Sequence, residues 1–339
     1  MKAAPTALKD RDVSCVDRAA PLALSAEAEN AFDPSCADCS VSVIVPAYNG
    51  AEWIAETLDS ILKQTVRPAE VIVVNDGSTD GTSAAVRSFG NSVTLIETPN
   101  QGVCRARNLG AKTASSNWLA FCDQDDIWLP DKLEKQLRIA QQSPEIRCVI
   151  TDHAACTDGV INSRSHFSYA PPNFWNLDPD PAGFVVRQPI AGRMASFQPS
   201  ITSVLLVQRH FFLSFGGFDI AAQRWSTEDT CVHFRCLSVV PFGVVPQVLM
   251  LYRKHPKAGS ADSLKQLRNT IHVWKHMIAR YPEAKPWKRD LLSGVRLLRK
   301  DLRESVRHQR RQRIKKMLAR LGLWPVAADA PSDSPSSNR

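Results

Sequence analysis

The run Asp123-Gln124-Asp125-Asp126 has the composition of a metal-binding site. It follows the apolar residues 118–122 without a spacer. Carboxylates this close together repel one another and raise one another's pKa unless a cation lies among them. Their hard oxygen atoms suit Mg²⁺ or Mn²⁺, and such sites commonly combine one or two carboxylates with substrate phosphates. The run therefore predicts a divalent-metal centre. The alternative is a solvated acidic turn that caps the helix after Trp128.

Asp76 is a second candidate, in a turn that could bind a nucleotide. It belongs to Asn75-Asp76-Gly77-Ser78, which follows an apolar run and precedes a predicted helix. A carboxylate there can accept a hydrogen bond from a nucleobase or ribose, and the N-terminus of the helix favours a nearby phosphate. The alternative is structural, because Asp and Gly are good turn formers and Ser78 is a good N-cap.

Thr227-Glu228-Asp229 is a third candidate and could supply a general base. It stands at the start of a predicted helix over residues 230–240. Asp229, with Glu228 beside it, could take the proton of an acceptor hydroxyl, while a metal at Asp125 neutralises a departing diphosphate. Helix capping is the alternative, since acids in the first turn stabilise a helix.

The basic stretch Tyr252-Arg253-Lys254-His255 could complete such a site. Arg253 and Lys254 could face a diphosphate, and His255 could join the metal shell. The same residues could equally form an exposed basic loop.

Short apolar runs alternate with helical patterns through residues 41–142, and this order predicts how the candidates are positioned. The predicted strands are Val41–Val45, Val71–Val74, Val93–Glu97 and Trp118–Cys122, and the predicted helices are Ala51–Gln64, Thr79–Phe89, Gly102–Thr113 and Leu129–Gln142. Such alternation indicates an α/β fold, a mostly parallel sheet with helices on both faces. Because ligands bind at the carboxyl ends of parallel strands, we expect residues 46–49, 75–78 and 123–126 to meet at one edge.

Length and composition describe an ordinary globular protein. The chain has 339 residues, of which 44% are hydrophobic and 22% charged. No apolar run reaches the roughly 18–20 residues of a membrane span, and the charged N-terminus lacks the apolar core of a signal peptide. Nine scattered cysteines favour a reducing compartment, so a cytoplasmic location is expected. Cys36 and Cys39 form a lone CxxC, for which a metal or redox site is a minor alternative.

The positive charge is concentrated near the C-terminus. Residues 285–320 hold fourteen Lys or Arg and three acids, whereas the whole chain has a net charge of +8. A nucleic-acid binder would usually carry a basic face on its main domain, so a nucleic-acid partner is not expected. We divide the chain into a leader (1–39), a catalytic domain (40–260), a basic helical extension (261–324) and a tail (325–339).

The extension has two readings. Apolar residues recur at helical spacing, and the opposite faces are rich in Arg and Lys; the apolar positions are Leu291, Val295, Leu298, Leu302, Val306, Ile314, Met317, Leu318 and Leu321. A basic amphipathic helix can lie on an anionic membrane, which would place the protein at the inner face of the membrane. Alternatively, the apolar stripe packs against the catalytic domain.

Six stretches in this order resemble the motifs of glycosyltransferase family 2, the large GT-A group. The resemblance covers about residues 41–260 and is carried by VSVIVPAYNGAEWIAETLDSIL, EVIVVNDGSTDGT, NQGVCRARNLGA, WLAFCDQDDIW, SFGGFD with TEDTCVHFR, and LYRKHPKAGS. Each motif alone is weak evidence, but their order and spacing together are specific.

The resemblance implies a GT-A fold, that is, a Rossmann-like, mostly parallel mixed sheet. It also implies a nucleoside-diphosphate sugar donor, UDP-linked most often, and inversion of the anomeric centre. The roles that it implies are a base-binding site at Pro46, Ala47, Tyr48 and Asp76, Arg107 in the same region, Asp123 at the ribose or metal, Asp125 at the metal, and Asp229 as the base.

The sequence departs from the family pattern at Gln124, where a small residue is more usual, and it lacks the QxxRW run of processive synthases. That absence favours the addition of one or few sugars. Residues 159–198 match no motif and lie where acceptor specificity would be decided.

The favoured hypothesis is a glycosyltransferase that acts on a glycan or lipid-linked acceptor in surface or extracellular polysaccharide synthesis. The alternative is a catalytically silent nucleotide-sugar-binding scaffold, which would have no chemical need for both Asp125 and Asp229. A nucleotidyltransferase would be expected to show a Gly-rich, Arg- or Lys-bearing loop after the first strand, and residues 46–52 differ from that.

Overall fold

The computed structural model describes residues 39–175, 180–239, 241–256 and 262–320. The predicted leader, except for Cys39, and the predicted tail therefore lie outside the described residues, as does Cys36. Among the residues that the structure describes, no helix is both long and apolar enough to cross a bilayer.

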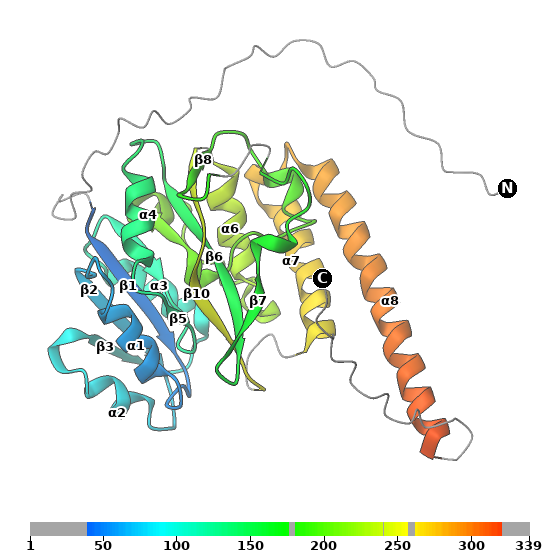
Figure 1. The fold of residues 1–339 in the computed structure, drawn as a ribbon, viewed down its shortest axis with the longest axis horizontal. Coiled ribbons are helices and arrows are strands. Elements are labelled where there is room, and N and C mark those ends of the chain that lie inside the picture. Colours follow the sequence, from blue (N-terminus) through cyan, green and yellow to red (C-terminus); the bar gives the residue numbers. More distant parts are fainter. Residues whose placement is uncertain (1–38, 176–179, 240, 257–261, 321–339) are drawn as a thin grey trace, which may run out of the picture. The chain divides into compact units, whose positions relative to one another are not determined.

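A ten-stranded mixed sheet forms the centre of the described chain, in the order β3-β2-β1-β4-β9-β6-β10-β5 (Figure 1). Its first half is parallel and consists of β1 (Val41–Ala47), β2 (Glu70–Asp76), β3 (Thr94–Thr98) and β4 (Trp118–Phe121). These are the four strands predicted from the sequence. All seven residues of β1 are buried, which fits a β-branched strand at the centre of a two-sided sheet.

The second half of the sheet mixes directions. The long strands β6 (Cys148–Thr157) and β10 (Phe242–Lys254) are parallel to each other, and the short β9 (Leu206–Gln208) joins β4 to β6 with antiparallel pairing. The remaining strands, β5 (Ile127–Trp128), β7 (Val160–Ser165) and β8 (Phe184–Val186), pair antiparallel to β10 or β6. The mostly parallel mixed sheet expected from the sequence is therefore present.

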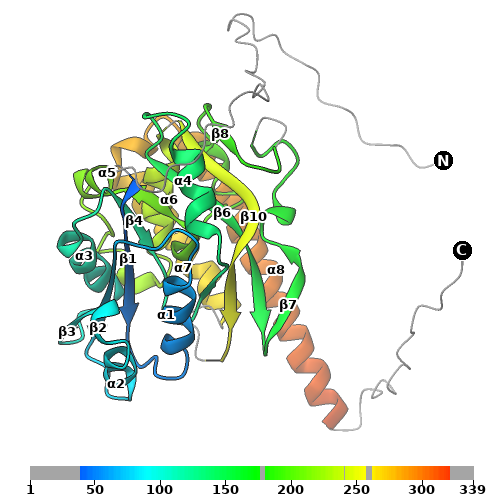
Figure 2. The same cartoon turned by 60° about the vertical axis from the view of Figure 1, so that its left-hand side comes forward.

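Helices cover the sheet as the alternation predicted (Figure 2). They are α1 (Ile54–Leu62), α2 (Thr82–Arg87), α3 (Val103–Thr113), α4 (Lys132–Ala140), α5 (Arg209–Ser214), α6 (Asp229–Ser238), α7 (Ser263–Arg280) and α8 (Lys288–Arg320). The close packing of α3 on β1 requires Gly110, because a Cβ there would lie 2.5 Å from a methyl carbon of Ile44.

The helix α7 shares its apolar face with the catalytic body, although the sequence division placed it in the extension. Trp274 is buried and meets the ring of Phe234 in α6 edge-on, with 5.8 Å between the ring centroids. The carboxylate of Asp219 accepts hydrogen bonds from Tyr281, at 2.7 Å, and pairs with His276 at the same distance. The helix that carries Asp229 is thus supported from behind by α7.

Candidate active site

The register of the parallel strands brings the polar strand ends together. Ala47 pairs with Asn75, and Ile44 pairs with Phe121. Pro46 comes two residues after Ile44, and Asp123 comes two residues after Phe121. The ends of β1, β2 and β4 therefore share one edge, as predicted.

The turns after β1 and β2 are joined by hydrogen bonds. Asn49 has φ +50°, a left-handed conformation that Asn tolerates. Its backbone N–H donates to Ser78 Oγ at 2.9 Å, and its side-chain oxygen accepts from the N–H of Thr79 at 2.8 Å. The predicted N-cap role of Ser78 is therefore replaced by this bridge between the two turns.

Gln124 ties the acidic run to the end of β1. Its Oε1 accepts from the N–H of Tyr48 at 2.9 Å, and its Nε2 donates to the carbonyl of Tyr48 at 3.0 Å. Gly50 makes room for this side chain, because a Cβ there would lie 2.1 Å from Gln124 Oε1. The Tyr48 side chain itself is 47% exposed at this edge. Gln124, where the sequence departs from the family pattern, thus holds the backbone of Tyr48 by two hydrogen bonds.

Asp76 is buried and holds the start of α3. Its two oxygens accept from the N–H of Gln101 at 2.8 Å and of Gly102 at 2.6 Å. Gly102 has φ +93°, which a side chain would disfavour. A carboxylate has about four lone-pair sites, so these bonds leave acceptor capacity. The observed role of Asp76 is structural, and contact with a nucleotide remains a prediction.

Arg107 is buried between two carboxylates that are far apart in sequence. One guanidinium nitrogen lies 2.5 Å from Asp123 Oδ1 and another lies 2.8 Å from Glu228 Oε1. Burial alone would lower the pKa of Arg107, but Asp123 and Glu228 raise it, so the side chain stays cationic. Arg107 therefore bridges the residues at the end of β4 and the start of α6, and its contact with the donor stays a prediction.

Asp125 and His255, the two residues predicted to hold a metal, face each other. Asp125 Oδ2 lies 2.9 Å from His255 Nε2, and the imidazole stacks on Trp53 with 4.0 Å between the ring centroids. Burial and the charge of Asp123 raise the pKa of Asp125, against the opposing hydrogen bond from His255. Within the described ranges, no group of three or more His, Cys, Asp or Glu side chains is arranged to hold a metal. The pair supplies two donors, which fits an ion that takes its other ligands from phosphate and water.

Arg253 fastens the loop of His255 to the acidic run. Its Nε donates to the carbonyl of Asp125 at 3.0 Å, and its guanidinium pairs with Glu56 at 2.6 Å. Arg253 is thus half-buried and held by the site, whereas Lys254 beside it is exposed. The contact of either residue with a diphosphate stays a prediction.

Asp126 is turned into the protein and has a structural role. It is buried and accepts a hydrogen bond from Ser203 Oγ at 2.5 Å. Burial, together with the charges of Asp123 and Asp125, raises its pKa well above the ordinary value. Of the three acids in the run, Asp123 and Asp125 are therefore the ones that reach the edge of the sheet.

Asp229 stands at the first turn of α6 with a strongly perturbed carboxyl group. Burial and the neighbouring charge of Glu228 raise its pKa to about 7, while Arg107 opposes the rise. Its Oδ1 accepts only from the adjacent N–H of Thr230, at 2.8 Å, among the bonds found in the described chain. A carboxylate with this pKa is matched to proton transfer near neutral pH.

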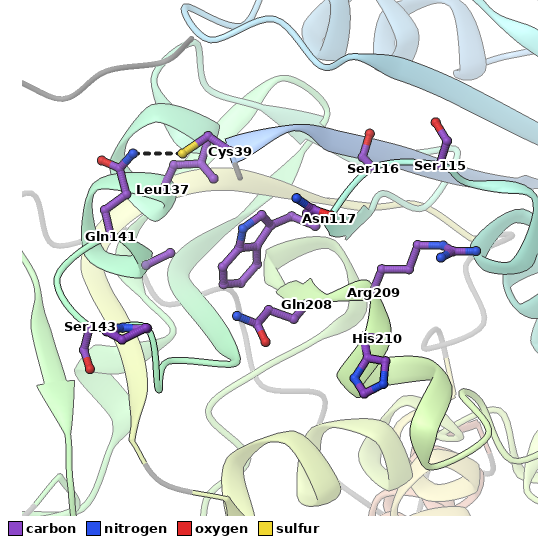
Figure 3. Close-up of a pocket in the computed structure, with 13 residues that line it drawn as sticks. Cys39, Ser115, Ser116, Asn117, Leu137, Gln141, Ser143, Gln208, Arg209 and His210 are labelled. Atoms are coloured by element: carbon purple, nitrogen blue, oxygen red, sulfur yellow. Dashed lines mark hydrogen bonds between the residues drawn. The ribbon is translucent and has the colours of Figure 1, made fainter. Parts of the chain in front are cut away.

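A separate cavity lies at the opposite end of the sheet. It has a volume of about 570 Å³ and is lined by Cys39, Ser116 and Trp118, which begin or precede β1 and β4, and by Gln208 (Figure 3). Because the acidic run follows the other end of β4, this cavity is remote from the residues described above.

Comparison with known proteins gives one consistent result. The sequence model of "Glycosyl transferase family 2" matches residues 42–200. An uncharacterized glycosyltransferase of Rickettsia prowazekii is 28% identical over 239 residues, which are 69% of this chain and 70% of that protein. The Escherichia coli protein UDP-Glc:alpha-D-GlcNAc-diphosphoundecaprenol beta-1,3-glucosyltransferase WfgD is 40% identical over 102 residues, which are 30% of this chain and 40% of that protein.

Solved structures show the same fold at low identity. S. aureus TarS 1-349 in complex with UDP-GlcNAc has a TM-score of 0.57 and 18% identity over 76% of this chain and 71% of that chain. The mannosyltransferase PcManGT from Pyrobaculum calidifontis, in complex with GDP-Man and Mn²⁺, has a TM-score of 0.54 and 22% identity over 79% and 76%. The GT-A fold predicted from the sequence is thereby confirmed.

Proposed function

The chain belongs to glycosyltransferase family 2, and we propose that it transfers a sugar, with inversion, from a nucleoside-diphosphate sugar to a glycan or lipid-linked acceptor. The observation that carries this proposal is the chain of contacts Glu228–Arg107–Asp123. It fixes the helix that begins with Asp229 against the acidic run that contains Asp125. These contacts hold the proposed proton acceptor close to the proposed metal ligands.

The proposed reaction is a single displacement. Asp229 takes the proton of the acceptor hydroxyl, and that oxygen forms a bond to the anomeric carbon while the bond to the diphosphate oxygen breaks. A Mg²⁺ or Mn²⁺ ion held by Asp125 and His255 would neutralise the departing diphosphate. Asp123, which pairs with Arg107 and is partly exposed, would contact the ribose or the ion. Glu228 acts on Asp229 through its charge and its pair with Arg107.

The donor would bind over the ends of β1 and β2. Pro46, Ala47 and the exposed Tyr48 form the floor for the base, with Asp76 behind them. A UDP-linked sugar is favoured, because the E. coli relative is named for UDP-Glc and the TarS structure holds UDP-GlcNAc. The relative's name also specifies a diphosphoundecaprenol acceptor, which supports a lipid-linked acceptor for this chain. We propose that the reaction belongs to surface or extracellular polysaccharide synthesis at the cytoplasmic face of a membrane.

Calorimetry tests the donor and metal site. We expect the parent protein to bind a UDP-sugar more tightly with Mn²⁺ than with EDTA, and Asp125→Ala to lose this metal dependence. Asp59→Ala, which removes an exposed carboxylate of α1, is the control and should behave like the parent. Equal donor affinity with and without Mn²⁺ in the parent would remove the metal from the proposal. The silent-scaffold alternative predicts metal-dependent binding without any donor turnover.

A further inference from the structure

The second half of α8, residues 305–320 (the distal α8 segment), is strongly cationic. It contains seven Lys or Arg residues and no Asp or Glu. Every side chain from Val306 to Lys315 is exposed, whereas Leu291 and Val295 near the start of the helix are buried. The first half of α8 therefore packs against the protein, as one reading of the sequence expected, and the distal α8 segment is left to face another medium.

The charges of this segment repel one another along the helix. Arg307 has Arg310 and Arg311 three and four residues ahead, and Arg310 has Arg313 three residues ahead. Like charges at these spacings destabilise a helix. Earlier in α8, Glu304 relieves such repulsion, because its carboxylate lies 4.0 Å from the ammonium group of Lys300. Glu304 is the last acidic residue of the helix. An anionic surface would remove the repulsion.

Two large apolar side chains are exposed among these cations. Ile314 is 44% exposed and Met317 is 53% exposed, one turn apart in the helix. A helix that combines Lys and Arg with exposed apolar residues is suited to the boundary between lipid headgroups and acyl chains. Nucleic acid would be bound by the cations alone, so the apolar pair favours a bilayer.

The distal α8 segment lies at the same end of the molecule as the candidate active site. The helix α7 begins at Ser263, eight residues after His255, and α8 runs back along it. Arg310 and Arg313 line a groove of about 620 Å³ together with Asp262 and Ser263, at the start of α7. Figures 1 and 2 both show the end of α8 on the side toward which β1 points.

We propose that the distal α8 segment docks the enzyme onto an anionic bilayer, with the carboxyl edge of the sheet toward the membrane. Arg307, Arg310 and Arg311 would contact lipid phosphates, and Ile314 and Met317 would enter the headgroup region. In this position a lipid-linked acceptor can reach Asp229 without leaving the bilayer. The orientation toward an acceptor rests on the proposed function, but the docking itself does not.

Vesicle co-sedimentation of the full chain tests the docking. The probes are vesicles of phosphatidylcholine alone and vesicles with 30% phosphatidylglycerol. We expect binding to the anionic vesicles only, and weaker binding as salt is raised. Changing Arg307, Arg310 and Arg311 to Gln should weaken partition roughly 100-fold, at about fivefold per cation. The matched control changes three exposed cations of the catalytic domain, Lys63, Arg67 and Lys112, to Gln.

The outcomes separate docking from its alternatives. Equal losses in the two triple variants would overturn the proposal, as would equal binding to neutral and anionic vesicles. Ile314→Asn with Met317→Asn should weaken vesicle binding several-fold while leaving the weak, salt-sensitive binding to a 30-base-pair RNA duplex unchanged. Tighter binding to that duplex than to anionic vesicles, at the same ionic strength, would assign the segment to nucleic acid instead.

A soluble assay separates this proposal from the proposed function. Turnover of a nucleotide sugar with a water-soluble acceptor should be the same in the parent and in the Arg307, Arg310, Arg311 variant. With an acceptor embedded in anionic vesicles, only that variant should show a KM raised on the order of 10-fold or more. Complete absence of donor turnover in the parent would refute the proposed function, and vesicle binding would still decide the docking.

Discussion

Asp229→Asn should make the enzyme slower and more stable. As the proposed base, Asp229 must lose its proton to act, and Asn has no basic oxygen. We expect turnover to fall on the order of 10²–10⁴-fold, with donor affinity nearly unchanged. Asn keeps an acceptor oxygen for the N–H of Thr230, so the local hydrogen bond is retained.

The stability effect follows from the raised pKa of Asp229. Its pKa rises from an ordinary 3.8 to about 7 on folding. Between about pH 4 and pH 7 the folded state holds a proton that the unfolded state lacks, so stability falls as the pH rises through this window. At about 1.4 kcal/mol per pH unit the upper limit is about 4 kcal/mol. Solvent reaches part of the side chain, which reduces the expected gain for Asn to about 1–3 kcal/mol at pH 8.

Urea unfolding of the parent and the Asn variant at pH 5 and pH 8 measures this effect. The Asn variant should be more stable at both pH values, and its gain at pH 5 should be about a third of its gain at pH 8, because pH 5 lies only about one unit into this window. Asp219→Asn is a control of opposite sign: burial alone would raise the pKa of Asp219, but hydrogen bonds from His276 and Tyr281 lower it, so its loss should destabilise.

The activity of the parent gives the second readout. Its kcat/KM should fall about tenfold per pH unit below pH 7 and level off above it. Parental turnover in the Asn variant would refute the assignment of Asp229 as the base. An Asn variant less stable than the parent at pH 8 would refute the claim that ionising this buried carboxyl group costs stability.

Two further substitutions test the contacts around the site. Arg107→Met leaves Glu228 buried without its cation, so we expect a loss of about 3–5 kcal/mol at pH 8 in urea unfolding. The acid limb of the pH–rate profile should also move upward by about one pH unit or more, since Arg107 opposes the rise in the pKa of Asp229; an unmoved limb would argue against the bridge. Gln124→Ala removes both hydrogen bonds to Tyr48, at about 1 kcal/mol each, so the donor KM should rise between about 5- and 30-fold with kcat nearly unchanged; a selective loss of kcat would contradict this.

The parallel half of the fold could be predicted because its signals are local. Each of β1 to β4 is an apolar run followed by a turn and a helical pattern, and parallel pairing places all their carboxyl ends at one edge. For this reason the residues after β1, β2 and β4 could be predicted to meet. We predicted from the residues that His255 could join the metal shell of Asp125, 130 residues earlier in the chain. The two side chains lie 2.9 Å apart, and the metal shell stays a prediction.

The second half of the sheet and the contacts between helices were not predictable in the same way. The strand β9 has only three residues, Leu206–Gln208, too few to show a period. The bridge from Arg107 to Glu228 spans 121 residues, and no pattern in one sequence shows that α3 and α6 face each other. The role of Gln124 could not be predicted from the sequence either. Its partner is the backbone of Tyr48, and a backbone group leaves no pattern in the sequence.

Donor turnover across a panel of nucleotide sugars tests the central claim most directly. The full chain is incubated with UDP-, GDP- and dTDP-linked sugars, with Mn²⁺, with Mg²⁺ or with EDTA, and release of the nucleoside diphosphate is measured. We predict release from at least one donor, UDP-linked first of all, that stops with EDTA and is lost in Asp229→Asn. No release from any donor with either metal, or release that continues unchanged in EDTA and in the Asn variant, would contradict a metal-dependent glycosyltransferase with Asp229 as its base.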